Sequence, residues 1–498
     1  MLSNVGISVA DYGQGNYRGF GQAFTTQQDL SELHKAMTAD QITGTQTLGL
    51  DLTGAPLKTE SLEKTLKVLE FREQDIRLWK RIPKLPAFNT VEEYVQLKSY
   101  GGLVGGFWKE GELPDESDST YVRQAELIKY LGVTGEVTHQ ATLVKSIIDI
   151  YRQEINNKAM EILRINNQGL TKADSSIVPE EYNGLYKQHQ DIGGLYPTLQ
   201  DYYSSDVVID LRGRSLTQAD VATSSRVILE KFGYANLLYA PPIVIEDLAS
   251  DYFQRQRIIM GGGPTGGYQG TIGTVPQSIS TTTGNLELQH DLFMQTAPPR
   301  KLTTPADSTK APNPVIVNNP PAAVADPLSQ FEAGDYYFAV APINRYGQGT
   351  LTIMDGAATT VAAGQAVDLD FQDGGGAIPA TGYVIYISLK DDPTPNVNDI
   401  LFYPVFKVSL QDLAAGYDGG APGIIRDRQR IIANTQQAFS IQANDQVWSF
   451  KQLAPLMKMN LAILSPAFRF MVLLYGTPFL YAKEKMVRFI NIGRFVQP

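Results

Sequence analysis

The sequence has 498 residues, a formal net charge of −10, and a content of 43% hydrophobic and 10% aromatic residues. This length allows about three domains, and the composition provides for large cores and excludes global disorder. The acidic balance argues against a sequence-independent nucleic-acid binder, which needs a basic face, but leaves room for an acidic shell that encloses nucleic acid.

Cysteine is absent, which excludes disulfide scaffolds, thiolate zinc sites and cysteine nucleophiles. Residues 1–10 lack a basic region and a sustained apolar core, so they do not predict a signal peptide. The most apolar stretch, residues 467–482, contains Arg469 and a Gly-Thr-Pro break at 476–478. It is typical of two buried strands and not of a membrane helix. We therefore expect no membrane contact and a cytosol-like compartment.

The N-terminal region lacks a strong periodic pattern. Residues 1–57 are rich in Gly, Gln and Thr and predict an extended N-terminal arm that gains order only against a partner. Residues 58–90 predict a helix near 60–68 and a connection that leads into the next segment.

Residues 91–137 predict a long hairpin arm, with strands near 94–100 and 121–131 joined by a glycine-rich segment and an acidic tip. The acidic residues of the tip are Glu110, Glu112, Asp115, Glu116 and Asp118. An isolated hairpin is marginally stable in water, so we expect this one to lie along a neighbouring molecule. A flap folded over its own domain is the alternative.

Residues 138–167 show apolar positions at helical spacing and predict the longest helix, with Thr138 as N-cap. The sequence Asn-Asn-Gln-Gly at 166–169 predicts its end, since glycine favours helix termination. About 30 residues at about 1.5 Å each would make a rod of roughly 45 Å. Such a helix suits a structural spine in a domain that spans residues 138–205.

Residues 206–296 predict an α+β domain. Strands are expected at 206–210 and 236–240, and a helix is expected near 245–259. Thr217 and Asp220 resemble a capping box and predict a further helix that ends at Gly233. The apolar residues expected on that helix are Val221, Ile228, Leu229 and Phe232.

Residues 297–427 predict an inserted β-sandwich with its linkers, in which 297–330 is a Pro- and Ala-rich linker and 416–423 a loose closing stretch. Short alternating strands are expected at 335–341, 349–353, 366–371, 382–387 and 401–408. The run Tyr336–Val340, followed by the turn Asn344–Gly349, is of the kind found in immunoglobulin-like and fibronectin-like modules. Residues 428–498 resume the surrounding domain and are expected to end in buried strands at 468–475 and 479–492.

No catalytic, cofactor-binding or metal site is predicted, and we expect no enzyme. The histidines share no helix-face spacing and are expected to be ordinary surface or partly buried residues; they are His34, His139, His189 and His290. The glycine-rich run 261–266 matches G-x-G-x-x-G, but it follows a helix and contains Pro264, so the dinucleotide-binding context fails. It predicts a flexible loop.

Two other patterns are too weak to predict a site. Asp368, Asp370 and Asp373 do not have the spacing of a calcium loop, and no glutamate closes the loop. They are expected to face outward from a strand and turn. The 25 tyrosines are scattered, which favours packing in cores and interfaces over a carbohydrate-binding face.

Taken in chain order, these segments resemble the major capsid proteins of tailed bacteriophages, and most strongly those of large myophages of the SPO-one and Twort kind. The C-terminal part contributes most of the resemblance, through Leu453–Met459, the apolar strand Phe470–Gly476 and the basic closing strand Lys485–Ile492. In the N-terminal half the segments that resemble the family are 74–84, 130–134, 216–220 and 232–233. The resemblance covers about residues 60–498.

The resemblance implies the Hong Kong 97-type capsid fold, of class α+β. Its parts would be the N-terminal arm at 1–57, the helix and connection at 58–90, the extended hairpin arm (E-loop) at 91–137, the peripheral domain at 138–205 with its spine helix at 138–167, the axial domain at 206–296, the inserted immunoglobulin-like domain at 297–427, and the return to the axial and peripheral domains at 428–498.

The resemblance also implies a structural function in the virion. Copies would form hexamers and pentamers of an icosahedral shell, assembled in the host bacterial cytoplasm and lying near the packaged DNA without binding it specifically. No long helical scaffold region is visible, so a separate scaffolding protein is implied, together with a portal and decoration proteins. No cofactor is expected. No Lys, Asn and Glu set matches the crosslinking chemistry of some relatives, so we predict no crosslinking.

Two other functions remain open on the sequence alone. A non-viral, encapsulin-like nanocompartment shell would have the same fold with a cargo-docking groove. A phage tail or adhesin-type protein would bind through the inserted module and would form a small oligomer.

Overall fold

The computed structural model describes residues 70–101, 107, 109–112, 116, 118–144, 149–190, 195–255, 278–462 and 465–494. The chain divides into two units, Met1–Val68 and Leu69–Pro498, and all described residues belong to the second unit. The expected arm at 1–57, the expected helix near 60–68, His34 and the glycine-rich run 261–266 therefore lie outside the described residues.

The first sheet joins distant parts of the chain in the strand order β1-β20-β21-β4. Its strands are β1 (Lys84–Pro86), β20 (Trp448–Asn460), β21 (Ala467–Leu480) and β4 (Lys129–Thr138). Strand β4 pairs with β21 in an unbroken antiparallel ladder from Thr138 opposite Ala467 to Lys129 opposite Gly476. Because β21 lies between β4 and β20, it connects residues more than 300 positions apart in the sequence.

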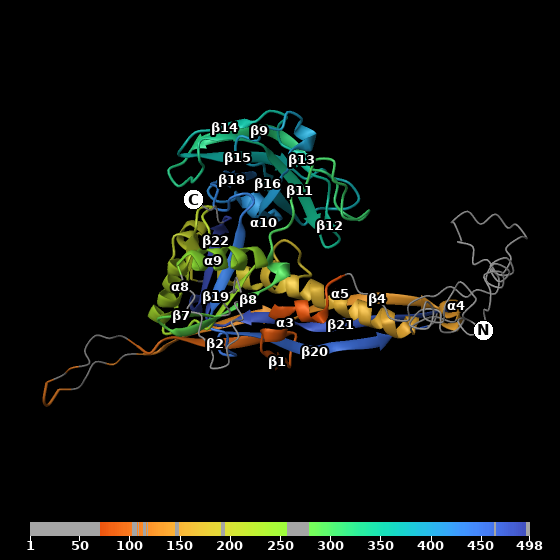
Figure 1. The fold of residues 1–498 in the computed structure, drawn as a ribbon, viewed down its shortest axis with the longest axis horizontal. Helices are drawn as coiled ribbons and strands as arrows, with labels where there is room; N and C mark the ends of the chain where they lie inside the picture. The colour runs from red at the N-terminus through yellow and green to blue at the C-terminus, as the bar shows by residue number, and fades with distance from the viewer. Residues whose placement is uncertain are drawn as a thin grey trace, which may run out of the picture. The chain divides into compact units, whose positions relative to one another are not determined.

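Helix α5 (Ile150–Lys172) lies along β4 and β21 and covers one face of the first sheet (Figure 1). Its residues Ile162 and Leu170 are fully buried in one hydrophobic core with residues of β21. The β21 residues of this core are Phe470, Val472, Leu474 and Leu480. Helices α3 (Arg77–Arg81) and α6 (Leu185–Gln190) pack against α5. The short elements η3 (Glu73–Asp75) and α7 (Leu199–Tyr203) precede α3 and follow α6 in the chain.

The predicted boundaries of the long helix were wrong at both ends. Thr138 is the last residue of β4, and only the short helix α4 (His139–Leu143) follows it. The N-cap of α5 is Asp149, whose carboxylate accepts the backbone N–H groups of Tyr151 and Arg152 at 3.1 and 3.2 Å. The helix also continues through Gly169 to Lys172, and its 23 residues make it about 35 Å long.

Gly169 has a packing role and does not end the helix. A Cβ atom at this position would lie 2.8 Å from the hydroxyl oxygen of Tyr182, which is buried against α5. The prediction that Gly169 ends the helix was therefore wrong. Both a helix end and the close approach of another side chain favour glycine, so the sequence alone does not distinguish them.

The second sheet is mixed, with the strand order β5-β22-β19-β6-β8-β7. Its strands are β5 (Val208–Asp210), β6 (Leu237–Ala240), β7 (Ser278–Thr281), β8 (Gly284–His290), β19 (Gln436–Ile441) and β22 (Met486–Ile492). Helices α8 (Gln218–Glu230) and α9 (Pro242–Arg255) share its core, and η4 (Leu292–Met294) follows β8. Helices and sheets occur together, as the predicted α+β class requires.

The predicted capping box of α8 is confirmed. Asp220 accepts the backbone N–H of Thr217 at 3.0 Å, and Arg214 donates two hydrogen bonds of 2.6 Å to the same carboxylate. The predicted apolar set is confirmed only in part: Val221 and Ile228 are fully buried, whereas Leu229 and Phe232 are exposed.

The C-terminal strands differ from the prediction. The apolar stretch contains no break, because β21 runs through 476–478 as one strand, and η6 (Lys483–Lys485) separates it from β22. The ladder with β4 ends at Gly476, so β21 has no β4 neighbour at Pro478 and tolerates its missing amide hydrogen there. No described helix is long and apolar enough to cross a membrane.

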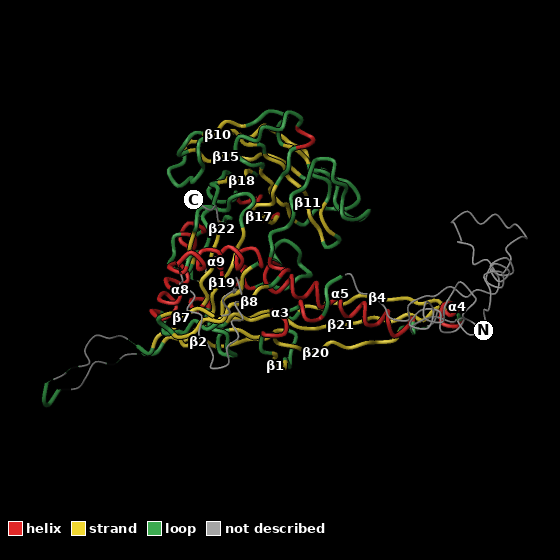
Figure 2. Tube along the Cα trace, viewed as in Figure 1, coloured by secondary structure: helices red, strands yellow, loops and turns green. Residues whose placement is uncertain are grey.

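Residues 297–427, which we call the β-module, contain two main sheets with a shared core. One has the order β12-β11-β16-β17 with β13 beside β11, the other the order β18-β15-β9, and β10 pairs with β14. Its elements are β9 (Ile316–Ala325), β10 (Gly334–Tyr336), β11 (Phe338–Asn344), β12 (Gly347–Gln348), β13 (Thr352–Ile353), β14 (Thr359–Val361), β15 (Gln365–Gln372), β16 (Gly382–Ile387), η5 (Val397–Asp399), β17 (Tyr403–Ser409), α10 (Leu410–Ala415) and β18 (Ile424–Asp427). Figure 2 shows these strands as a group separate from the first sheet.

Strand β9 corrects the prediction of a linker over 297–330. It is an edge strand that pairs with β15, and the pairing is irregular between Asp368 and Asp370, opposite which lie Pro320 and Pro321. Prolines are tolerated at such a place because an edge strand has one unpaired side and a bulge needs fewer amide donors.

The two ends of the β-module lie close together. We call the rest of the described chain the host. Thr296 donates its backbone N–H to the side chain of Gln436 at 3.0 Å and its hydroxyl to the carbonyl of Thr435 at 2.8 Å. The host residues Ile177 and Val178 pack on the outer face of the β11–β16 pair. The β-module is therefore attached at its ends and along one sheet face.

Substitution of Gly476 tests the packing of β21. In Gly476→Ala the new Cβ would lie against the Phe450 ring and 2.5 Å from the carbonyl oxygen of Lys451. We expect a loss of about 1 to 3 kcal/mol in the free energy of unfolding, measured by denaturant titration of the unassembled protein. Gly356→Ala is the matched control, because nothing lies within 4 Å of its Cβ position. Equal stability of the two variants would contradict this packing.

His189 is fully buried, contrary to the prediction for the histidines. Its Nε2 donates to the carbonyl of Met486 and its Nδ1 accepts from the Tyr202 hydroxyl, both at 2.8 Å. Burial lowers the pKa of His189 from 6.5 to about 3. The unfolded chain therefore binds a proton below about pH 6.5 that the folded chain does not, and stability falls as the pH drops through this range.

We expect His189 to account for about 2 kcal/mol of the stability lost between pH 7 and pH 5. Denaturant titrations at both pH values should show that decline reduced by this amount in His189→Gln, although this variant is less stable at pH 7. The exposed His139 provides the control, since His139→Gln should decline like the wild type. An unchanged decline in His189→Gln would show that His189 is protonated in the folded protein.

Candidate assembly surface

The predicted strand pair of the arm is present, with an outgoing strand that begins earlier than predicted and a returning strand that ends earlier. Strands β2 (Val91–Ser99) and β3 (Thr120–Leu127) are antiparallel, with Val91 opposite Leu127 and Leu97 opposite Tyr121. The expected continuation of the returning strand beyond Leu127 was wrong, because residues 129–138 pair with β21 as β4. Of the expected acidic tip, Asp115 lies outside the described residues, and the other members are exposed: Glu110, Glu112, Glu116 and Asp118.

One face of the hairpin is anchored to the host. Tyr94 makes edge-to-face contacts with Phe479 and Tyr481, with ring centroids 5.6 and 4.9 Å apart. Glu92 accepts a 2.8 Å hydrogen bond from Lys451 of β20. Burial disfavours the ionised form of Glu92, but hydrogen bonds from Lys451 and from backbone amides outweigh it and hold the pKa of this carboxyl below its usual value. The root of the hairpin is therefore rigidly placed.

The opposite face of the hairpin is apolar and exposed; we call it the outer hairpin face. Its large apolar residues, with their exposed fractions, are Val91 (41%), Val95 (65%), Leu97 (40%), Tyr121 (66%) and Leu127 (55%). They lie on one face because alternate residues of a strand point to the same side. Between Val91 and Leu97, the same face also contains Ala125 and the ion pair of Glu93 with Arg123.

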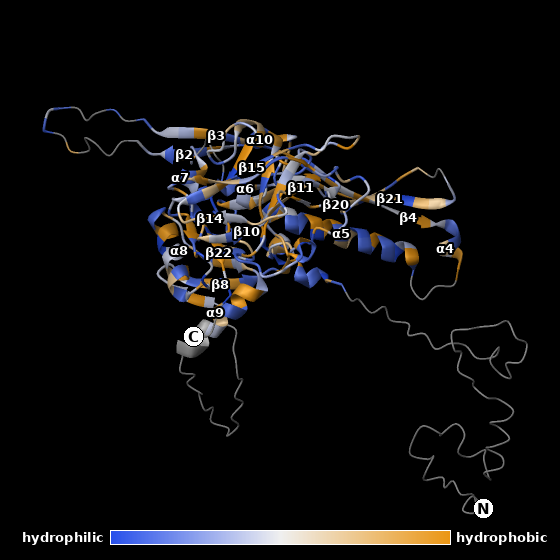
Figure 3. Ribbon diagram, turned by 90° about the horizontal axis from the view of Figure 1, so that it is seen from above, coloured by the Kyte–Doolittle hydropathy of each residue, from blue (hydrophilic) through white to orange (hydrophobic). Residues whose placement is uncertain are grey.

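A second apolar surface lies on the side of the first sheet that α5 does not cover; we call it the outer sheet face. The register places Tyr130 beside Tyr475, and Leu473 beside Gly132 and Met457. The apolar residues of this face are the exposed Tyr130 and Met459, the half-buried Met457, Met471 and Tyr475, and the buried Leu473. Figure 3 shows hydrophobic stretches along β4 and β21. Gly132 has no side chain, and Leu473 occupies that space.

Strand β20 presents an open edge next to this face. Strand β1 pairs only with residues 450–452, so residues 453–460 have no described neighbour on that side. Leu453, Leu456 and Met459 are exposed in this segment. Pro455 lies among them, and proline on an edge strand limits uncontrolled pairing with other chains. The edge therefore favours side-chain contact over continued sheet formation.

The remaining residues that the sequence singled out do not converge on a reaction centre. His139 is exposed, and Nδ1 of His290 lies 3.4 Å from a guanidinium nitrogen of Arg77. Asp368 pairs with Arg426, and Asp370 accepts from Asn318 and Asn319 on β9. In the part of the chain that the structure describes, no group of three or more histidines and carboxylates could hold a metal ion.

The outer hairpin face was not identified from the sequence, although the alternation of Val91, Val95 and Leu97 was visible. Alternation by itself shows that a strand has two faces and does not show which one the protein covers. The structure decides this, because the polar set of Glu92 and Gln96 faces the host.

The chain has relatives in sequence among known proteins. No protein-family model matches the sequence. The chain is 23% identical over 450 residues to the major capsid protein of Staphylococcus phage K, which covers 88% of this chain and 90% of that protein. It is 23% identical over 245 residues to a putative major capsid protein of Enterococcus phage phiEF24C, which covers 48% of this chain and 50% of that protein.

Among solved structures, the capsid of a native GTA particle gives a TM-score of 0.45 at 8% identity over 91% of this chain and 99% of that one. The capsid of Myoviridae phage XM1 gives a TM-score of 0.39 at 7% identity over 86% of this chain and 96% of that one. Over most of its length, the chain is similar in sequence to phage major capsid proteins.

Proposed function

We propose that this protein is a structural major capsid protein, whose copies assemble into the shell of a phage head. The sequence similarity over 88% of the chain supports this function. The main structural support for this function is the outer hairpin face. This apolar surface on a two-stranded ribbon is not covered by any other part of the described chain. A surface of this kind is stable in water only when another molecule covers it.

The proposal extends to the Hong Kong 97-type arrangement and to membership in the SPO-one and Twort kind of myophage. In that arrangement β2 and β3 form the extended arm, α5 is the spine of the peripheral domain, and the second sheet with α8 and α9 forms the axial domain. Copies form hexamers and pentamers, and each arm lies over the adjacent subunit. The acidic tip of the arm then faces lysine or arginine side chains of that neighbour.

The β-module is proposed to be immunoglobulin-like and to project from the shell. The two sheets with a shared core support a sandwich, and the joined ends at Thr296 and Thr435 support an insertion into a complete host. A separate scaffolding protein, a portal and decoration proteins complete the head, which assembles in the bacterial cytoplasm around DNA. The absence of catalytic function and of crosslinking stays a prediction.

Negative-stain electron microscopy of the expressed protein, alone and with its scaffolding protein, tests the function. We expect closed shells, tubes or hexagonal sheets. Val95→Asp should abolish them, because a carboxylate would be buried in the subunit contact at a cost of about 3 kcal/mol or more, equivalent to roughly a 100-fold higher threshold concentration. The folded monomer should persist, because residue 95 lies opposite Arg123.

Leu389→Asp is the control for this experiment. Leu389 is 40% exposed on the β-module, and its substitution should leave assembly unchanged. Discrete small particles from the wild type under both conditions would overturn the capsid function and favour a tail or adhesin-type protein. Shells from Val95→Asp at the wild-type concentration would show that the outer hairpin face is not a subunit contact.

Removal of the β-module tests its role as an insertion. We expect a chain in which a short glycine-serine linker replaces residues 298–429 to form the same lattice with a thinner outer layer, since Thr296 and Thr435 already lie in hydrogen-bond contact. Ile431, which belongs to the core of the second sheet, is kept. The variant should also contain Ile177→Thr and Val178→Thr, because the deletion uncovers these apolar side chains. The full-length chain with only these two substitutions is the control. Loss of the lattice in the deletion alone would show that the β-module takes part in the subunit contacts.

A further inference from the structure

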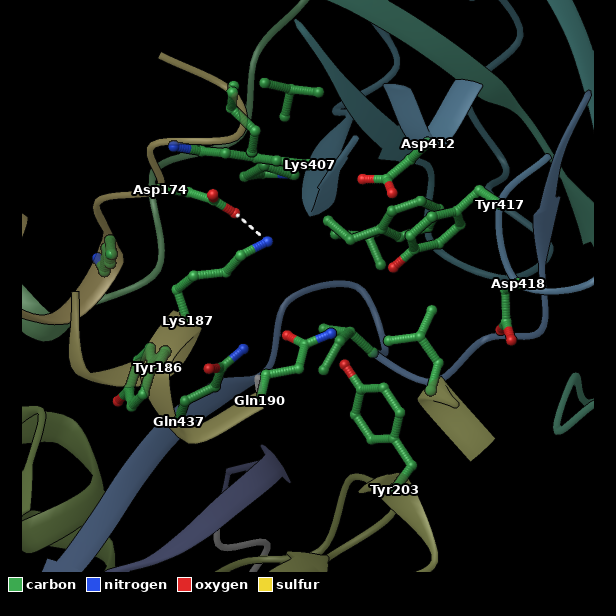
Figure 4. A pocket seen from close by; sticks show the side chains of 18 of the residues that line it. Asp174, Tyr186, Lys187, Gln190, Tyr203, Lys407, Asp412, Tyr417, Asp418 and Gln437 are labelled. Carbon is green, nitrogen blue, oxygen red and sulfur yellow. Dashed lines mark ion pairs between the residues drawn. The ribbon is translucent and has the colours of Figure 1, made fainter. Parts of the chain in front are cut away.

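A cavity of about 780 Å³ lies between the host and the β-module. The host side is formed by the end of α5 and by α6 and α7, and the module side by β17 and the loop that follows α10. Figure 4 shows Lys187 and Asp174 on the host side, paired with each other, and Lys407 and Tyr417 from the module. Neither the sequence nor the proposed shell function assigns a role to this space.

Positive charge exceeds negative charge in the cavity wall. The cations that line it are Lys172, Lys187, Lys407, Arg428 and Arg488, and the carboxylates are Asp174, Asp412 and Asp418. Each carboxylate is already engaged. Asp174 pairs with Lys187 at 3.2 Å, Asp418 with Arg428 at 2.8 Å, and Asp412 accepts the Ser409 hydroxyl at the start of α10 at 2.8 Å.

Three of the cations have no carboxylate within ion-pair distance among the described residues: Lys172, Lys407 and Arg488. This local excess occurs in a chain whose net charge is −10. Arg488 is buried, whereas Lys172 is half-buried and Lys407 is exposed. A buried cation without a paired anion is unfavourable, because desolvation of an ion costs several kcal/mol.

Arg488 is the most deeply buried cation of the cavity wall. It lies on β22 and is 7% exposed. Its Nη2 donates to Gln437 at 2.7 Å and its Nη1 to the Tyr202 hydroxyl at 3.3 Å, while the guanidinium lies 4.3 Å from the centre of the Tyr186 ring. Its Nε has no hydrogen-bond partner among the described residues, and neither has the Tyr186 hydroxyl. Arg488 and Tyr186 both line the cavity.

Lys172 and Lys407 approach the cavity from opposite sides, one from α5 and the other from β17. Burial and the nearby charge of Lys407 together lower the pKa of Lys172 to about 8, although Asp291 acts in the opposite direction. The Lys172 ammonium donates to the backbone carbonyls of Phe293 and Gln295. Burial raises the pKa of the Glu181 carboxyl, and the nearby charge of Lys407 acts in the opposite direction. Both lysines also line an adjoining cavity of about 550 Å³. Two ammonium groups thus share a space with no carboxylate bound to either.

We propose that this cavity binds an anion of the phosphate type, held by Arg488, Lys172 and Lys407. A guanidinium supplies directed N–H donors to phosphate oxygens, and lysines add point charges. The anion would bring together a host strand, the end of α5 and a module strand, and so would fix the β-module on the host. Free phosphate and a phosphate ester share this chemistry. The inference does not depend on the proposed shell function.

Calorimetric titration and thermal unfolding of the full-length, unassembled protein test the site. The probes are inorganic phosphate and, in a second arm, a nucleoside monophosphate, each compared with chloride at equal ionic strength and pH 7. We expect the melting temperature to rise with phosphate concentration, as for any ligand that binds only the folded state. Binding of the free ion alone, or of the ester alone, would identify the source of the phosphate group.

Lys172→Gln and Lys407→Gln should each weaken binding about tenfold or more, because each removes a charge-assisted hydrogen bond. Lys158→Gln is the matched control on α5, since Lys158 pairs with Glu154 and Glu161 outside the cavity. These variants also separate binding from the general stabilising effect of phosphate salts, which acts on every variant alike. Equal melting temperatures in phosphate and chloride, or equal shifts in Lys407→Gln and the wild type, would overturn the proposal.

Discussion

The antiparallel pairing of β21 with β4 and β20 is the contact on which the rest of the structure depends. It hydrogen-bonds a strand near residue 130 to one near residue 470 and places α5 against the resulting sheet. The core beneath α5 contains side chains from α3, α5, β20 and β21, so it is complete only when the C-terminal strands have joined the N-terminal half. Contacts between residues so far apart in the sequence require the closure of a long loop, and extensive burial must offset the loss of chain entropy.

The same sheet explains the surfaces that are left open. Helix α5 covers one face, the hairpin root covers a small part near Phe479 and Tyr481, and β1 covers only three positions of the β20 edge. The outer hairpin face and the outer sheet face remain uncovered within one described chain. A monomeric protein rarely leaves apolar patches of this extent, whereas a shell protein covers them with identical neighbours, so that each modest contact is repeated by symmetry.

The insertion of the β-module is compatible with this host because its ends are joined by direct hydrogen bonds at Thr296. A domain inserted between adjoining positions adds little loop entropy to the host. The β-module also contacts the host away from its ends. Ile177 and Val178 pack on one module sheet, and polar and charged residues surround the neighbouring cavity. The junction therefore combines an apolar contact with a space whose charge is unbalanced.

The sequence predicted those elements whose stabilising contacts join residues close together in the chain. The capping box at Thr217 and Asp220 was predicted because its hydrogen bonds join residues three positions apart, and Gly382–Ile387 was predicted because a run of β-branched and aromatic residues has few alternatives. The α+β class and the hairpin strands followed from the same kind of pattern. The expected function came from the resemblance to phage capsid proteins, because the composition alone did not distinguish a shell protein from other classes.

Tertiary contacts decided the rest. Strand β9 contains two prolines and resembles a linker until β15 provides a partner on one side. Strand β19 was not predicted, and it is a strand because β22 and β6 flank it. His189 and Gly169 owe their positions to Met486, Tyr202 and Tyr182, which lie elsewhere in the sequence. The sequence by itself thus determined the class, the local caps and the alternating strands. The pairing partners, the buried faces and the charged cavity depend on which distant segments meet, because the packing and hydrogen-bond energies between those segments exist only in the folded chain.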